Sequence, residues 1–328
     1  MKKIINAPER VEAEMLSGML KAYPQYLRML DGTSVLVRAA KKENKVAVIT
    51  GGGSGHEPAF GGYIGTGMLD AVCAGAVYTS PPADQIYEGI KAIDAGKGVL
   101  IVQMNYTGDI MNFDMAREMA EMEDIRVERV ITNDDVAVSD SLYTVGRRGV
   151  AGTILVQKIA GALAETGAEL DAVRAVAEKA NANVRTMGVA INPSTVPAAG
   201  VPGFELGEDE MEVGIGIHGE PGTHRESLKS ANEIADMLLE KILADMDFSG
   251  EVALLVNGSG GTPLMELFVV NDHVQDVLAA RGISVYKTFV GNYMTSLEQE
   301  GFSLTLMKLD DELKALLDAP ADTPALKV

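Results

Sequence analysis

The 328-residue sequence has one cysteine, no tryptophan and only 5% aromatic residues. A single cysteine excludes an intrachain disulfide bond and a metal centre built from several thiolates. Cys73 stands among small apolar residues, so we expect it to be a buried packing residue. Histidine is scarce too, with four residues in the chain, so the surroundings of each histidine carry information.

Positive charge is also in short supply. The chain has 28 Lys and Arg against 47 Asp and Glu, which gives a formal net charge of −19. This balance disfavours nucleic acid and anionic membrane surfaces as partners. No apolar run approaches the roughly 20 residues of a membrane-spanning helix, and the start of the chain is too polar for a signal peptide. We expect a cytoplasmic protein that binds neither nucleic acid nor membrane.

Apolar runs and amphipathic segments alternate along the first 180 residues, which is typical of a mostly parallel α/β sheet. A segment rich in proline and glycine, 192–207, follows them. Length and this change of composition predict two α/β domains, residues 1–185 and 186–328, with mostly parallel or mixed sheets and flanking helices. The expected strands are 46–49, 99–103, 127–131, 187–191, 213–217, 252–256, 284–290 and 303–308, and the main helices are 9–23, 153–166, 169–181 and 226–245.

The segment Thr50-Gly51-Gly52-Gly53-Ser54-Gly55-His56-Glu57-Pro58 follows the first buried strand. Four glycines in five residues argue against a regular strand, and glycine lets backbone N–H groups approach a ligand closely. The carboxyl end of a parallel strand is also the usual place for a site. A second histidine, His218, stands in a similar glycine-rich segment at 214–222. Each segment alone could be a tight turn with a surface histidine, but their repetition predicts that His56 and His218 belong to a site.

Several charged residues remain open to two interpretations. Asp109 follows the strand at 99–103, where it either joins the site or caps a helix from 110 to 122. Asp134 and Asp135 predict a solvated turn, or alternatively a cation site. Arg147 and Arg148 either hold a network of carboxylates or contact an anionic partner. His224 and His273 lack glycine-rich surroundings, so we expect them on the surface.

Nucleotide and metal sites are not expected in this chain. A phosphate-binding loop needs Gly-x-x-x-x-Gly-Lys-Ser/Thr, and a dinucleotide fingerprint needs Gly-x-Gly-x-x-Gly; neither glycine-rich segment fits. His56, Asp109 and His218 are residue types that can bind zinc. Their segments supply backbone donors rather than a second shell of ligands, so no metal is predicted.

Taken together, several motifs make the chain similar to the substrate-binding K subunit of dihydroxyacetone kinase, over essentially its whole length. The motifs are Gly51-Gly52-Gly53-Ser54-Gly55-His56-Glu57-Pro58, Asn105-Tyr106-Thr107-Gly108-Asp109, Asp135-Val136-Ala137-Val138, Gly146-Arg147-Arg148-Gly149, Thr195-Val196-Pro197-Ala198-Ala199-Gly200, Gly216-Ile217-His218-Gly219-Glu220-Pro221-Gly222 and Asp318-Ala319-Pro320.

The resemblance implies a homodimer in which His218 adds to the ketone carbonyl of dihydroxyacetone and forms a hemiaminal. His56 and Asp109 act as acid and base on the substrate hydroxyls. The backbone of Gly53, Ser54 and Gly55 borders the substrate. No cofactor is expected in this chain, because a separate subunit carries the nucleotide and delivers the phosphate.

One position departs from the family pattern. Met104 stands where a lysine commonly precedes the Asn-Tyr-Thr-Gly-Asp motif, in a place the resemblance assigns to substrate binding. A second hypothesis therefore stays open: a non-catalytic paralogue that binds dihydroxyacetone and acts as a sensor or coactivator of a transcription regulator. A generic sugar-binding module is a third, but it leaves the two histidine motifs unexplained.

Overall fold

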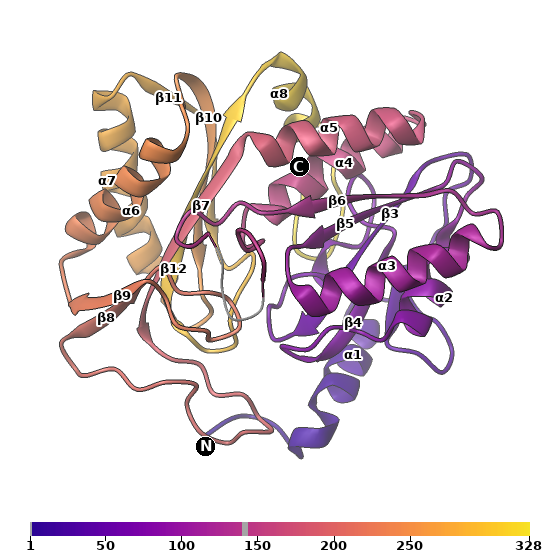
Figure 1. Ribbon diagram of the computed structural model, residues 1–328, viewed down its shortest axis with the longest axis horizontal. Coiled ribbons are helices and arrows are strands. Elements are labelled where there is room, and N and C mark those ends of the chain that lie inside the picture. Colours follow the sequence, from indigo (N-terminus) through magenta and orange to yellow (C-terminus); the bar gives the residue numbers. More distant parts are fainter. Residues whose placement is uncertain (1, 140–143) are drawn as a thin grey trace.

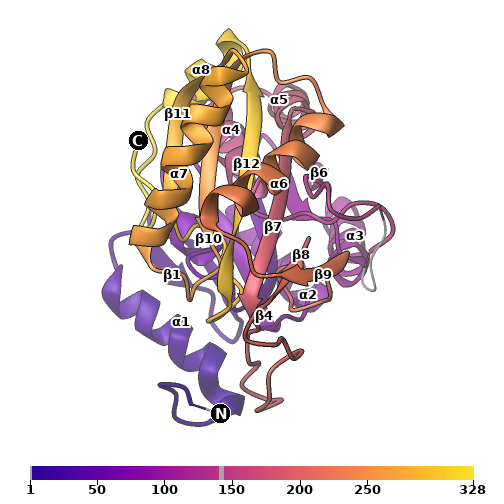
Figure 2. The ribbon, with the colours of Figure 1, turned by 90° about the vertical axis from the view of Figure 1, so that its left-hand side faces the viewer.

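Two six-stranded sheets stand next to each other in the computed structural model, which describes residues 2–139 and 144–328 (Figure 1). Helices pack between the sheets and on both outer faces, so the molecule is built from five layers. In Figure 2 the outer helices α6 and α7 lie in front of the second sheet. This arrangement confirms the expected α/β class with mixed sheets and flanking helices.

The first sheet has the strand order β1-β2-β4-β3-β5-β6. The strands β4, β3, β5 and β6 run parallel to one another. The strand β1 pairs antiparallel with β2, and β2 pairs antiparallel with β4. The strands are β1 (Leu27–Met29), β2 (Val35–Arg38), β3 (Ala47–Ser54), β4 (Ala71–Val77), β5 (Val99–Met104) and β6 (Val127–Thr132).

The second sheet has the order β11-β10-β12-β7-β8-β9, and only β10 and β11 are parallel. The strands are β7 (Val184–Asn192), β8 (Glu210–Val213), β9 (His224–Ser227), β10 (Gly250–Gly258), β11 (Ile283–Gly291) and β12 (Glu300–Leu309). The helices are α1 (Val11–Ala22), α2 (Ala83–Ile93), α3 (Thr107–Glu121), α4 (Thr153–Glu165), α5 (Leu170–Ala182), α6 (Ala231–Asp245), α7 (Leu264–Ala280) and α8 (Asp311–Asp318), with short 3-10 turns at Pro8–Arg10 and Gly61–Tyr63.

Three apolar clusters hold the layers together. One lies under α2 and α3 on the outer face of the first sheet, and a second lies under α6 and α7 on the outer face of the second sheet. The largest fills the space between the sheets around α4 and α5, and it includes residues of both halves, such as Leu155 from α4 and Met307 from β12. The predicted division at residue 185 falls inside β7 and stays a prediction.

The predicted helices and apolar strands are present, with ends shifted by a few residues. Two predictions in the second half are wrong. The strand β8 ends at Val213 rather than Ile217, so His218 lies in a turn. The helix expected from 226 begins at Ala231, because Ser230 and Glu233 form a reciprocal cap there. Residues 224–227 form the edge strand β9 instead, which places the exposed His224 on a strand.

The glycine run is the main surprise of the first sheet, because Gly51, Gly52 and Gly53 continue β3 as regular strand. Backbone that passes very close to the strand requires these glycines. A Cβ on Gly51 would lie 2.5 Å from the Cys73 carbonyl oxygen of β4, and one on Gly53 would lie 2.5 Å from the backbone nitrogen of Thr79. Tertiary packing therefore outweighs the poor strand propensity of glycine. Cys73 itself is buried, as predicted.

Residues 320–328 return to the first sheet after α8 ends. Thr66 and Asp322 exchange two backbone hydrogen bonds of 3.1 and 3.0 Å, and the Ala325 N–H donates to the carbonyl of Gly62. Ala321 and Leu326 are buried in this contact. Within the described part of the chain, every helix is either too short or too polar to cross a lipid bilayer.

Candidate active site

A cleft of about 700 Å³ opens at the carboxyl ends of β3 and β5 and is closed on one side by the turn that carries His218. Residues of both halves of the chain line it, so the cleft exists only when the two sheets are assembled. The lining residues are Gly53, Tyr78, Thr79, Ser80, Tyr106, Thr107, Gly108, Asp109, Asn112, Val196 and His218.

His56 lies directly after β3 and is fully buried. Its Nδ1 is 2.8 Å from the carbonyl oxygen of Thr295, which can only accept a hydrogen bond, so Nδ1 carries the proton. The other ring nitrogen, Nε2, is buried without a hydrogen-bond partner. His56 therefore presents an unshared electron pair on Nε2 that is ready to accept a proton or a hydrogen bond.

His218 is enclosed by aromatic rings. The centroid of its imidazole lies 4.8 Å from that of His56, 5.3 Å from Tyr78 and 4.4 Å from Tyr106, each in a nearly perpendicular orientation. Tyr78 in turn stacks on His56 at 5.3 Å. The structure thus brings together the two histidines that are 162 positions apart in the sequence (56 and 218).

Both imidazoles are neutral at physiological pH. Burial lowers the pKa of His56 to about 3, with a further contribution from His218. Burial also lowers the pKa of His218 to about 3, and the positive charge of Arg148 acts in the same direction. A neutral imidazole keeps the lone pair that a nucleophile or a base requires.

Asp109 occupies the first turn of α3 and is 5% exposed. The helix begins at Thr107 with Tyr106 as the capping residue, so the interpretation of Asp109 as the helix cap is wrong. Its Oδ1 is buried without a partner. Burial raises the pKa of Asp109 to about 7, against a contact with Ser80 that lowers it. A carboxyl group that titrates near neutral pH can both give and take a proton.

The three glycine-loop residues differ in what they offer. Gly53 lines the cleft. The hydroxyl of Ser54 donates to the carbonyl of Gly75 at 2.7 Å, and the N–H of Gly55 donates to the carboxylate of Glu57 at 3.1 Å. Both groups are therefore engaged within the protein, and the part of these residues that remains open to a ligand is the surface of Gly53.

Met104 is fully buried at the end of β5. A Cβ built on Gly52 would lie 3.8 Å from both the Met104 methyl carbon and Asp109 Oδ2, so the methionine tip and the carboxylate flank the same glycine. Met104 does not line the cleft itself. Its role in substrate binding stays a prediction.

Asp134 and Asp135 are buried, so the predicted solvated turn is wrong. Asp134 accepts hydrogen bonds from the N–H groups of Val150 and Gly152 at the start of α4. Asp135 binds Arg148, whose side chain is fully buried and also approaches Glu220. The expectation that the arginine pair holds a network of carboxylates is confirmed, because Arg147 binds Asp245.

Metal binding finds no support in residues 2–139 and 144–328, where no group of three or more His, Cys, Asp or Glu is arranged to hold an ion. A zinc site of His56, Asp109 and His218 is therefore not formed.

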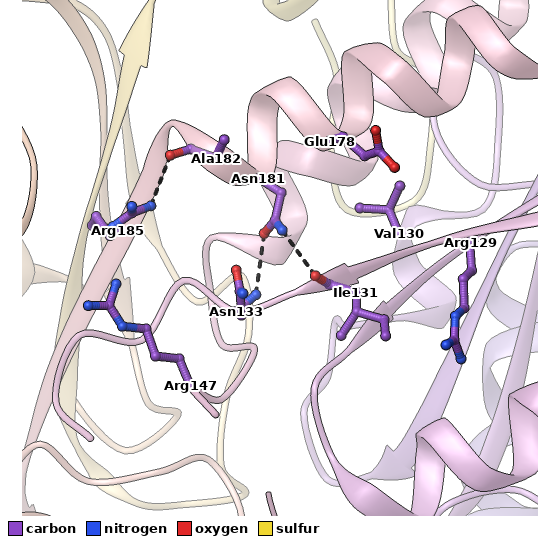
Figure 3. Close-up of a pocket in the computed structure, with 9 residues that line it drawn as sticks. All are labelled: Arg129, Val130, Ile131, Asn133, Arg147, Glu178, Asn181, Ala182 and Arg185. Carbon is purple, nitrogen blue, oxygen red and sulfur yellow. Dashed lines mark hydrogen bonds between the residues drawn. The ribbon is translucent and has the colours of Figure 1, made fainter. Parts of the chain in front are cut away.

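A second cavity, of about 610 Å³, lies between β6, α5 and the start of β7 (Figure 3). Its three arginines, Arg129, Arg147 and Arg185, already bind the carboxylates of Asp114 or Asp245.

Sequence reasoning missed two neighbours of His56. Thr295 reaches it from the loop between β11 and β12. Tyr78 follows β4 with a positive φ of 58°, and its hydroxyl contacts those of Ser194 and Ser296 at 3.1 and 2.7 Å. No local pattern marks Thr295. For Tyr78, the sequence offers one signal: the turn motif Ser80-Pro81-Pro82 just after it predicts that the chain turns at this position.

Comparison with known families now adds to this geometry. The Dak1 domain matches residues 17–325, nearly the full length of the chain. The chain belongs to the Dak1 family.

Relatives of this Dak1 chain carry informative names. The PTS-dependent dihydroxyacetone kinase 1, dihydroxyacetone-binding subunit DhaK, of Listeria innocua is 52% identical over 328 residues, which cover 99% of this chain and 100% of that protein. Among solved structures, the dihydroxyacetone kinase from C. freundii in complex with AMP-PNP and Mg2+ matches with a TM-score of 0.91 and 32% identity, over 99% of this chain and 61% of the other.

A third similar protein has a different role in its name. The dihydroxyacetone kinase operon co-activator Dha-DhaQ matches with a TM-score of 0.90 and 38% identity, over 95% of this chain and 97% of the other. Fold similarity alone does not separate a kinase subunit from a coactivator, so the site has to be considered.

Proposed function

We propose that this Dak1 protein is the dihydroxyacetone-binding subunit of a dihydroxyacetone kinase. The observation that carries the proposal is that neutral His218 and the titrating carboxyl of Asp109 line one cleft, with neutral His56 buried against the His218 ring. Three groups of this reactivity so close together are more than a sugar-binding module needs. The 52% identity with a full-length DhaK subunit supports the same reading.

His218 captures the substrate in this proposal. A ring nitrogen adds to the ketone carbon, and the carbonyl π electrons move onto oxygen. That oxygen takes up a proton while the imidazolium formed loses its N–H proton, so the hemiaminal is neutral overall. The protonated form of Asp109 can supply one proton and Nε2 of His56 can accept the other.

Covalent capture selects for a carbonyl group, because an alcohol such as glycerol offers no carbon for the nitrogen to attack. A terminal hydroxyl of the captured substrate then receives the phosphoryl group as it loses its proton to ionised Asp109. The phosphate comes from a separate nucleotide-carrying subunit. The relative from Listeria innocua is named as the dihydroxyacetone-binding subunit of a PTS-dependent kinase, which supports that division of labour.

The sensor hypothesis remains the second candidate, because the coactivator shares the fold and Met104 replaces the usual lysine. Both functions need capture by His218, but only the kinase needs turnover. The assay that separates them is phosphorylation of dihydroxyacetone in the presence of the cognate donor subunit. The homodimer and the cytoplasmic location stay predictions, and sedimentation of the purified protein tests the first.

The capture step is tested with dihydroxyacetone labelled with ¹³C at the carbonyl carbon. Binding to the wild type should replace the carbonyl signal of the bound ligand by that of a tetrahedral carbon. His218→Ala should abolish this signal, whereas His224→Ala should leave it unchanged, since His224 is an exposed residue bonded to Thr223 and Glu226. A ligand that binds the wild type with an intact carbonyl would refute covalent capture.

A further inference from the structure

Three of the sequence motifs converge on one buried guanidinium behind His218. The Arg148 side chain is fully buried. Its Nε donates to Asp135 at 2.7 Å, and its Nη2 donates to the carbonyl of Gly214 at 2.7 Å. On its other side Nη1 lies 3.6 Å from Glu220. Arg148 therefore joins a carboxylate from the first half of the chain to one from the turn that carries His218.

Glu220 holds that turn in place. Its carboxylate is almost fully buried, and Oε2 accepts the backbone N–H of His218 at 2.9 Å. The turn is shaped to admit it, because a Cβ on Gly216 would lie only 2.1 Å from the Glu220 carboxyl carbon. The carboxylate thus fixes the backbone of the nucleophile two residues before it.

A buried carboxylate beside a histidine creates a conflict. A negative charge within about 4–6 Å of an imidazole favours the protonated ring, and a protonated ring has no lone pair for addition to a carbonyl. The charge of Glu220 acts to raise the pKa of His56, whereas Arg148 lowers that of His218. Without compensation, the charge of Glu220 would therefore favour the protonated form of the histidine pair while the same carboxylate positions His218.

We propose that Arg148 is a positioning residue that neutralises Glu220, so that the carboxylate can hold the His218 turn without favouring the protonated form of the histidine pair. This role rests on the proposed function of His218 as the nucleophile. Arg148 does not line the cleft, and it acts through its two carboxylate partners.

No other group described around His218 carries a positive charge that could compensate Glu220. His56, Tyr78 and Tyr106 face the imidazole, and all three are neutral at pH 7. Asp109 lines the same cleft from α3, and burial raises its pKa to about 7. Asp135 lies on the Arg148 side, with its own pKa raised to about 6 by burial. The pKa of His218 is lowered by burial first and by Arg148 second.

The test compares variants at position 148 that keep or remove the charge. In Arg148→Met the positive charge that lowers the pKa of His218 is lost and the charge of Glu220 is uncompensated. The pKa of His218 should therefore rise, and the neutral fraction of the imidazole should fall as pH decreases through the new value. Formation of the ¹³C-labelled adduct should then fall roughly tenfold or more between pH 8 and pH 5.5. Arg148→Lys and the wild type should form the adduct at both pH values.

The matched control is Arg147→Met, which removes the neighbouring arginine from its partly buried pair with Asp245 and should leave the pH profile unchanged. A double variant, Asp135→Asn with Arg148→Met, guards against misfolding because it removes both members of the buried ion pair. It should show the same acid loss as Arg148→Met. Adding Glu220→Gln to it should restore adduct formation at pH 5.5.

NMR titration of the His218 ring in the ligand-free variants gives a readout that needs no substrate. An adduct that is lost equally at pH 5.5 and pH 8 would overturn the role of the Arg148 charge and leave only a structural one. An unchanged profile in the Met variants would also overturn it. A wild type that forms no adduct at any pH would instead refute the proposed function.

Discussion

At the scale of single residues, Asp109 gives the sharpest prediction. Asp109→Asn preserves the shape of the side chain but removes the proton-transfer group, so turnover with the donor subunit should fall roughly 10²–10⁴-fold. Dihydroxyacetone binding should persist. Steady-state kinetics measures the loss, and Asp114→Asn in the same helix, where the carboxylate binds Arg129 on the surface, is the matched control. Equal losses in both variants would contradict the assignment.

The same variant has a predicted effect on stability. The pKa of Asp109 is about 7 in the folded protein, against 3.8 for an aspartate in an unfolded chain. Between these pH values the folded chain keeps a proton that the unfolded chain has released. Stability conferred at low pH is therefore lost as pH rises through this window. Asp109→Asn should raise the free energy of unfolding by on the order of 2 kcal/mol at pH 8 and change it little at pH 4, as measured by urea unfolding.

The residues of the site could be found from the sequence where their chemistry is rare. His56, His218 and Asp109 follow predicted strands or stand in glycine-rich segments. The structure places Asp109 and His218 in one cleft and His56 against the His218 ring. The residue that orients the His56 ring could not be found from the sequence, because Thr295 reaches His56 through the tertiary fold alone. Burial, which sets the pKa values of the two histidines, is likewise a property of the assembled molecule.

At the scale of elements, two helix glycines make a matched pair. Gly161 on α4 faces the backbone of Met68, where a Cβ would lie 2.4 Å from the carbonyl oxygen, whereas Gly18 on α1 has open space around it. Gly161→Ala should destabilise the protein by about 1–3 kcal/mol through overpacking. Gly18→Ala should stabilise it by roughly 0.5–1 kcal/mol, because alanine favours helix.

Thermal unfolding measures both variants. A destabilisation by Gly18→Ala as large as that by Gly161→Ala would show that the backbone contact of α4 with Met68 is not what requires glycine.

Elements with a strong local signal were predictable, and those defined by their neighbours were not. Val99–Met104 is apolar except for Gln103, which predicts a buried strand, and all six residues are buried. The Gly-rich end of Ala47–Ser54 lacks strand propensity and is held extended by its pairing with β4 on one side. The strand His224–Ser227 is mostly exposed and polar, so no apolar pattern in the sequence predicts it.

At the scale of the whole molecule, the last residues stabilise a distant loop. Leu326 is buried, and its segment bonds to Gly62 and Thr66 near the first sheet. Leu326→Ala should cost about 2–3 kcal/mol and accelerate hydrogen exchange of the Thr66 amide, which donates to Asp322. Val328→Ala, at a side chain that is 37% exposed, should do neither. Unchanged hydrogen exchange of the Thr66 amide in Leu326→Ala would show that the burial of Leu326 does not stabilise the loop around Thr66.

The two-sheet α/β class followed from the alternation of apolar and amphipathic segments, but the arrangement of the sheets did not. The apolar face of α4, which includes Leu155 and Ile159, reads as one buried helix in the sequence. In the structure it fills the space between two sheets whose strands are far apart in the chain. Long-range contacts of this kind have no local signature.

The return of residues 320–328 to the first sheet also governs when the molecule can work during its own synthesis. A ribosome releases the chain from its amino end, so the strands that position His56 emerge long before Thr295, which holds its ring, and Asp322, which pairs with Thr66. A nascent chain that has exposed only the first sheet holds His56 without its hydrogen-bond acceptor and without His218 opposite it. The proposed capture of a ketone therefore begins only after Asp322 has emerged, and chains that end before residue 218 carry no histidine pair.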